Sequence, residues 1–150
     1  MADKTTSSIV IARPRQIVMG VIADFASYPE WAGMNSAEVL ELGTDGRARR
    51  VRFGLDAGVI KDSYVLGYDW DGDAQVRWDL AEKGSVISEM SGGYLLADRG
   101  ADTEVTFDLA VGVRIPMIGM IKRRAEKTII DTALKGLKSR AEAVVGDSRD

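Results

Sequence analysis

The sequence predicts an α+β domain in which a curved antiparallel sheet of about six to seven strands surrounds a long C-terminal helix. Two observations lead to this fold class. Between residues 38 and 113 apolar and polar residues alternate in runs separated by turn residues, whereas from 116 to about 145 the apolar spacing becomes helical. Consecutive strands joined by tight turns form an antiparallel meander, and a curved sheet needs a large element to pack against its hollow face.

The N-terminal segment is expected to hold one short strand and two short helices. Residues 8–12 form a β-like apolar run, and Pro14 suits the first turn of a helix. Helical spacing continues over 15–25, and this helix should stop before Pro29, because the residue ahead of a proline is disfavoured in the α region. A second short helix is expected over 30–34.

The middle of the chain reads as a series of strands. Turn signals that contain glycine, such as the one around Gly72, separate them and predict hairpins. The adjacent glycines Gly92 and Gly93 predict a bulge that switches the inward face of their strand. The expected strands cover 38–42, 50–55, 60–70, 75–80, 86–96 and 103–113.

The last segment, from 116 to about 145, has one broad apolar face and a charged face opposite it. The apolar face contains small residues that do not fill space, including Ala125, Ala133 and Gly136. We therefore expect this helix to cross the sheet without filling its hollow. One domain should cover residues 1–150, with 1–6 and 146–150 flexible.

Composition excludes several kinds of site. The chain has 150 residues and neither cysteine nor histidine, so a thiolate nucleophile, a histidine-containing triad and a histidine-ligated zinc site are impossible. No metal or other cofactor is expected. A net charge of −3 argues against nucleic-acid binding. The N-terminal residues are polar and no apolar run approaches about 18 residues, so a cytoplasmic location is expected.

Three segments carry a resemblance to a known family. A Tyr-Pro-x-Trp step at 28–31 closes the first helix. Gly93-Tyr94 stands late in a strand ahead of the Thr-Glu-Val-Thr-Phe run at 103–107. The Pro-Met-Ile-Gly run at 116–119 leads into a helix that carries Ala-Leu-Lys-Gly-Leu-Lys at 133–138. Together these resemble the polyketide cyclase/dehydrase and lipid-transport family of the START-like (SRPBCC, helix-grip) superfamily, and look closest to its actinobacterial branch.

This resemblance implies a helix-grip (START/Bet v 1-like) fold with a deep apolar cavity between the sheet and the last helix. Members bind lipids, sterols, quinones, plant hormones or polyketides, and a minority are enzymes. The superfamily shares a cavity and not a catalytic motif, so the fold alone does not settle the function.

Strand parity and the helix face give the candidate ligand-binding residues. The alternative is that the same residues form an ordinary core. Buried Tyr and Trp side chains usually find polar partners, and ligand pockets combine apolar walls with a few such groups. Trp31 is expected either to pack its short helix on the sheet or to gate the cavity, and the 116–119 loop is a second possible gate. The candidates are Trp31, Phe53, Tyr64, Leu66, Trp78, Met90, Tyr94, Phe107, Met117, Ile121 and Ala125.

The favoured function is binding of a hydrophobic small molecule such as a lipid, a quinone or a polyketide-like compound. The alternative is a polyketide cyclase or dehydratase in which Asp62, Tyr64 or Tyr94 assists proton transfer, although the missing histidine weakens it. A buried, isolated Asp62 would have a raised pKa, whereas a strand-end Asp62 would be paired or solvated.

A third hypothesis is a quinone or lipid chaperone at a membrane, or a partner of another protein. A basic cluster early in the last helix supports it, since such a cluster can attract an anionic surface. The alternative is a solvated face offset by Glu126 and Asp131. A monomer or a homodimer is compatible with the sequence. The basic cluster consists of Lys122, Arg123, Arg124 and Lys127.

Overall fold

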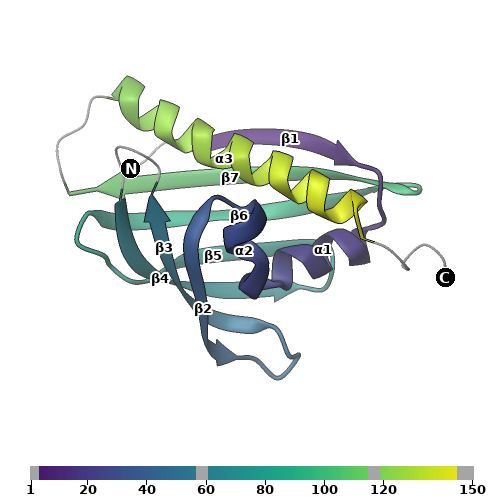
Figure 1. Cartoon of the computed structure of the whole chain (residues 1–150), viewed down its shortest axis with the longest axis horizontal. Coiled ribbons are helices and arrows are strands. Elements are labelled where there is room, and N and C mark those ends of the chain that lie inside the picture. The colour runs from purple at the N-terminus through teal and green to yellow at the C-terminus, as the bar shows by residue number, and fades with distance from the viewer. Residues whose placement is uncertain (1–3, 57–60, 115–118, 145–150) are drawn as a thin grey trace.

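The computed structural model describes residues 4–56, 61–114 and 119–144, and the side chain of Ile121 lies outside that description. In this part of the chain, one sheet of seven antiparallel strands curves around a long helix (Figure 1). The elements are β1 (Thr5–Ile11), α1 (Arg15–Ala23), a 3-10 turn (Phe25–Ser27), α2 (Tyr28–Trp31), β2 (Met34–Leu42), β3 (Ala48–Asp56), β4 (Lys61–Asp71), β5 (Gln75–Glu82), β6 (Ile87–Arg99), β7 (Asp102–Val113) and α3 (Gly119–Glu142).

The strand order is β1-β7-β6-β5-β4-β3-β2, so every pair from β2 to β7 is a hairpin between chain neighbours. β1 joins the far edge by pairing with β7, for example Ile9 opposite Val105. The helix α3 lies across one face of this sheet, and α1 and α2 lie on the same side (Figure 1). The predicted fold class, an antiparallel sheet that surrounds a C-terminal helix, is confirmed.

Several predicted boundaries need correction. β1 begins at Thr5 and pairs it with Leu109, so residues 5 and 6 belong to the sheet and not to a flexible end. The second helix covers Tyr28–Trp31 and includes Pro29 in its first turn, where the missing N–H of a proline costs no intrahelical hydrogen bond.

The bulge predicted at Gly92 and Gly93 is wrong, because β6 keeps its register with both neighbours there. The register shift lies nearer the start of the strand, between Ile87 and Glu89. Gly92 instead allows a close approach: a Cβ there would lie 2.3 Å from the Asp108 carbonyl oxygen and 3.1 Å from the Trp78 ring. The inward-facing glycine therefore gives the Trp78 indole room to lie over its neighbouring strand.

Both ends of α3 are tied to the sheet. Near its start the carboxylate of Glu126, only 1% exposed, accepts hydrogen bonds from the Thr5 hydroxyl (2.7 Å) and from the backbone N–H of Val111 (2.9 Å). Lys122 Nζ lies 3.8 Å from the same carboxylate. A buried carboxylate is tolerable only when such donors replace water, so these contacts fix the helix over β1 and β7.

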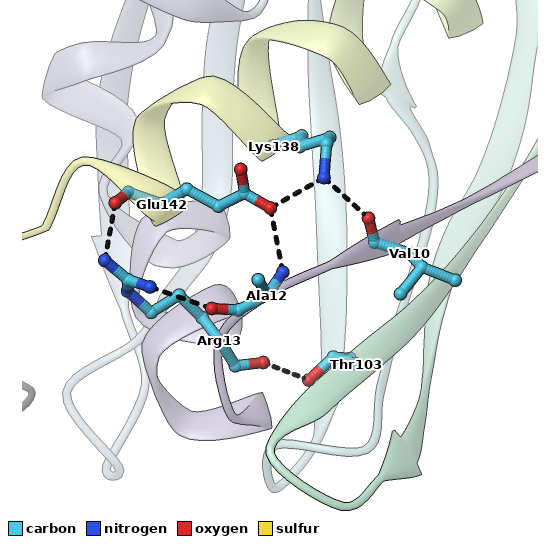
Figure 2. Close-up of polar contacts among 6 residues, drawn as sticks. All are labelled: Val10, Ala12, Arg13, Thr103, Lys138 and Glu142. Carbon is cyan, nitrogen blue, oxygen red and sulfur yellow. Dashed lines mark hydrogen bonds and ion pairs between the residues drawn. The ribbon is translucent and has the colours of Figure 1, made fainter.

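A second polar cluster holds the end of α3 against the residues that follow β1 (Figure 2). Glu142 accepts a hydrogen bond from the backbone N–H of Ala12 (2.8 Å) and pairs with Lys138 (2.6 Å). Lys138 also donates to the Val10 carbonyl (3.0 Å), and the Arg13 guanidinium donates to the Glu142 carbonyl (2.5 Å). The hydrogen bonds that the carboxylate accepts from Lys138 and from the Ala12 N–H, in that order, lower the pKa of the Glu142 carboxyl.

Candidate ligand cavity

The space between the hollow face of the sheet and α3 contains a cavity. Strand alternation turns one face of β3 to β7 toward it, and α2 and α3 cover that face. All the side chains around it are apolar or aromatic, and none carries a formal charge. The wall consists of Tyr28, Ala32, Met34, Phe53, Leu55, Tyr64, Leu66, Tyr68, Trp78, Met90, Tyr94, Phe107, Leu109, Ile129 and Ala133.

The cavity is narrow, with a volume of about 40 Å³. A single water needs roughly 10–15 Å³ by this measure, so the space has room for only about three water molecules. Large rings occupy the rest of the hollow: the ring centroids of Tyr68 and Trp78 lie 5.7 Å apart, and those of Trp78 and Tyr94 lie 5.5 Å apart. The expected deep cavity is therefore largely filled by its own aromatic lining.

An open cleft of about 230 Å³ lies beside the cavity. It shares Ala32, Leu55 and Ile129 with the cavity wall, so these three side chains lie at the boundary between the two spaces. Its other walls include Gly33 and Thr132. The cleft and the cavity are therefore adjacent spaces that meet at these three side chains.

Seven of the residues predicted from the sequence lie on the wall. Two predicted residues are buried but do not line it: Ala125, on α3 one turn before Ile129, and Trp31. The Trp31 ring centroid lies 4.8 Å from that of Tyr28, and the Trp31 backbone carbonyl approaches Gly136 of α3. Its two expected roles, packing its short helix on the sheet or gating the cavity, stay predictions. Met117 and the side chain of Ile121 lie outside the described residues. The seven are Phe53, Tyr64, Leu66, Trp78, Met90, Tyr94 and Phe107.

Sequence reasoning missed eight wall residues. Five of them carried the same signal as the residues that were found: Leu55, Tyr68 and Leu109 share strand parity with predicted residues, and Ile129 and Ala133 lie on the predicted apolar face of the last helix. The other three come from the 28–34 segment, whose approach to the sheet depends on how α2 packs. The eight are Tyr28, Ala32, Met34, Leu55, Tyr68, Leu109, Ile129 and Ala133.

The wall also contains polar atoms. The Tyr28 hydroxyl donates to the Ile22 carbonyl (2.5 Å). Among the described residues the Tyr64 hydroxyl and the Trp78 indole nitrogen are buried and have no hydrogen-bond partner. Burial raises the pKa of Tyr64 and of Tyr94, and the negative charge of Asp62 adds to the effect at Tyr64. These phenols are therefore neutral at physiological pH.

Asp62 does not line the cavity. Its carboxylate accepts hydrogen bonds from three consecutive backbone N–H groups, those of Ser85 (2.9 Å), Val86 (2.9 Å) and Ile87 (2.7 Å). Burial opposes ionisation of the carboxyl, but these hydrogen bonds outweigh it and lower the pKa. The hypothesis of an isolated carboxyl with a raised pKa is wrong, because Asp62 holds the turn before β6.

The basic cluster early in α3 is partly neutralised. Lys122 pairs with Glu126, and Lys127 Nζ lies 2.6 Å from Asp131, so both predicted offsets are present. Arg123 and Arg124 are exposed, and Met120 beside them is 59% exposed. None of the helices in the described ranges is long and apolar enough to cross a lipid bilayer.

Comparisons with known proteins agree with this architecture. Residues 2–142 match the family model described as polyketide cyclase / dehydrase and lipid transport. A START superfamily protein from Mycobacterium smegmatis superimposes with a TM-score of 0.84 at 18% identity, over 93% of this chain and 97% of that one. No curated protein sequence matches the chain.

Two further solved structures share the fold. The Zhui aromatase/cyclase from Streptomyces sp. R1128 gives a TM-score of 0.77 at 17% identity, over 95% of this chain and 94% of its own. The protein TTHA0849 from Thermus thermophilus gives a TM-score of 0.78 at 21% identity, over 96% of this chain and 100% of its own. The fold is thus the START-like helix-grip fold. The chain belongs to the polyketide cyclase / dehydrase and lipid transport family.

Proposed function

We propose that this protein binds a hydrophobic small molecule between the sheet and α3. One observation carries the proposal: the core contains a cavity with an uncharged wall of aromatic and aliphatic side chains, and this cavity shares wall residues with an open cleft. Ligand sites are concave and mostly apolar with a few placed polar groups, and this wall has that composition. The family description, which includes lipid transport, also supports binding of a hydrophobic molecule.

A ligand larger than a few atoms must widen the cavity. Met34 and Met90 lie on the wall, and methionine side chains change rotamer at low cost. Ile129 and Leu55, at the boundary with the cleft, are the side chains that must move aside for access. Burying about 300 Å² of apolar ligand surface would yield about 7 kcal/mol before the costs of association and of this widening.

The test is to reduce the cavity and measure binding. Ala133 lies on the wall and is 4% exposed, so Ala133→Leu fills the space, and Ala133→Val is a milder version. Ala143 is exposed, and Ala143→Leu is the matched control. The bicyclic hydrocarbon tetralin serves as the probe, titrated by calorimetry, with circular dichroism to verify folding.

Both Ala133 variants should lose tetralin binding, in order of added volume, while Ala143→Leu should bind like the parent protein. Undiminished binding in folded Ala133→Leu would reject the cavity as the site. If the cavity is the site, mass spectrometry of molecules that co-purify with the parent protein would identify the natural ligand class.

A second candidate function is cyclisation or dehydration of a polyketide chain. The family description names this activity, and Tyr64 and Tyr94 place neutral phenols on the wall. A phenol can donate a proton to a developing oxyanion, and a shaped cavity can fold a flexible chain. The test is turnover of a poly-β-keto thioester mimic by the parent protein and by Tyr64→Phe and Tyr94→Phe. Equal rates would remove both hydroxyls from the mechanism.

Membrane contact is a third candidate, favoured by exposed Met120 beside Arg123 and Arg124. An apolar side chain flanked by arginines suits the surface of an anionic bilayer. Co-sedimentation with phosphatidylserine vesicles should fall as salt rises, because electrostatic attraction is screened. Arg123→Glu should abolish it. Binding that is equal on neutral vesicles would contradict this docking mode.

A further inference from the structure

The identity of the unpartnered polar atoms on the cavity wall defines the chemistry of the ligand. This inference rests on the proposed function, because it concerns the molecule that occupies the same cavity. Two of the wall residues, Tyr64 and Trp78, are 2% and 7% exposed. Their polar tips, the hydroxyl and the indole nitrogen, are buried and have no partner in the described part of the chain.

Such atoms are rare in folded proteins, since a buried polar group without a partner has lost its water and gained nothing in exchange. Among the described residues the Trp31 indole nitrogen, which is not on the cavity wall, also lacks a partner, whereas two other polar aromatic tips are satisfied by carbonyls. The Tyr28 hydroxyl donates to the Ile22 carbonyl, and the Trp70 indole donates to the Ala48 carbonyl at 2.8 Å. The Tyr64 hydroxyl and the Trp78 indole nitrogen, in contrast, have no carbonyl acceptor.

The two groups require an acceptor. An indole N–H can only donate, so Trp78 recognises an oxygen or another acceptor atom and cannot recognise a donor. The Tyr64 hydroxyl can also donate, and burial together with the nearby charge of Asp62 keeps it protonated. Each of these neutral donors on the wall matches a carbonyl or ether oxygen.

The same wall disfavours ions. None of its side chains carries a formal charge, so a carboxylate or an ammonium group would enter a low-dielectric space without a counter-ion. The carboxylate of Asp62, whose charge acts on Tyr64, has its oxygens occupied by the backbone N–H groups of residues 85–87. The aromatic faces of Phe53, Tyr68 and Phe107 favour a planar, ring-bearing body.

We propose that the ligand is a neutral, ring-bearing molecule with one or more carbonyl or ether oxygens that accept hydrogen bonds from the Tyr64 hydroxyl, the Trp78 indole or both. Charged lipids such as free fatty acids are excluded from this position. The two donors thus select among hydrophobic molecules of equal size by their polar group.

Three bicyclic probes of similar size test this selection: tetralin, which has no oxygen, 1-tetralone, which has one carbonyl, and 1-naphthoate, which is an anion. The parent protein should bind tetralone about tenfold more tightly than tetralin, the range of one or two hydrogen bonds, and naphthoate more weakly than either. At least one of Tyr64→Phe and Trp78→Phe should reduce the preference for tetralone to about threefold or less. Trp70→Phe removes an indole that is not on the cavity wall and should keep the parent preference.

The outcomes separate the two proposals. The proposed role of the two donors is wrong if tetralin binds as tightly as tetralone, or if folded Tyr64→Phe and Trp78→Phe both keep the parent preference. Either result leaves the proposal of an apolar binding cavity intact. Tighter binding of naphthoate than of tetralone also overturns the selection for neutral ligands. If none of the three probes binds, the proposed function itself fails and the donor pair fails with it.

Discussion

The backbone carbonyl of Trp31 faces Gly136 so closely that a Cβ on Gly136 would lie 1.9 Å from the Trp31 oxygen. The short helix α2 therefore contacts the backbone of α3 directly, with no side chain between them. This contact sets the distance from α2 to α3, and Tyr28 and Ala32 at the two ends of that short segment both line the cavity. A single glycine thus helps to fix the width of the proposed binding site.

Gly136→Ala should destabilise the protein. The added methyl group collides with backbone, which cannot swing away, so we expect a loss of about 1–3 kcal/mol even after the gain in helix propensity. Gly20→Ala in α1 is the matched control, because a Cβ there meets nothing within 4 Å. Urea unfolding should show that the control is as stable as the parent or up to about 1 kcal/mol more stable. Equal behaviour of the two variants would contradict the tight contact.

Glu126→Gln should weaken the attachment of α3 to the sheet. The neutral amide offers one oxygen where the carboxylate accepts from both Thr5 and Val111, so one donor loses its partner. We expect a loss of about 1–3 kcal/mol by chemical denaturation. Asp131→Asn, which breaks the exposed pair with Lys127, should cost less than about 1 kcal/mol. A Glu126 variant as stable as the Asp131 control would show that the buried carboxylate is not the anchor.

Asp62 should make stability depend on pH. The folded protein lowers the pKa of this carboxyl below its unfolded value of about 3.9, so its contribution is present above that value and is lost as pH falls through the lower folded value. Asp62→Asn should therefore be less stable than the parent at pH 7, and the difference should shrink steadily below about pH 4. A stability difference that stayed constant from pH 7 to pH 2 would contradict the assignment.

Tyr64→Phe should stabilise the ligand-free protein, in contrast to its expected loss of ligand preference. Removing a buried hydroxyl without a partner relieves a desolvation cost, and we expect a gain of about 1 kcal/mol. Tyr28→Phe, which removes a hydroxyl bonded to the Ile22 carbonyl, should lose about the same amount. Thermal unfolding of both variants measures whether each substitution raises or lowers the stability of the protein. A destabilised Tyr64→Phe would show that its hydroxyl has a partner before any ligand arrives.

Strand parity was sufficient to predict much of the site. A period of two places alternate residues on one face, and this alone located Phe53, Tyr64, Trp78 and Phe107 on the cavity wall. The long amphipathic pattern at the C-terminus likewise predicted the helix that covers them. Both predictions depend on short-range periodicity, which a single sequence contains in full.

Other features depend on contacts between distant residues and could not be predicted. Asp62 binds backbone N–H groups more than twenty positions away, and the N–H group is common to every residue except proline, so no residue type marks the partner. The width of the cavity could not be predicted from the sequence either. Parity shows which aromatic side chains face inward, but the space between them depends on rotamers and on the Trp31–Gly136 contact.

The most direct test of the central claim is an isotope-filtered nuclear Overhauser experiment on the protein with bound 1-tetralone. A ligand in the cavity predicts cross-peaks from its protons to the methyl groups of Leu66, Ile129 and Ala133, which lie on opposite walls of the hollow. Cross-peaks confined to exposed apolar side chains such as Leu42 and Met120 would contradict binding between the sheet and α3.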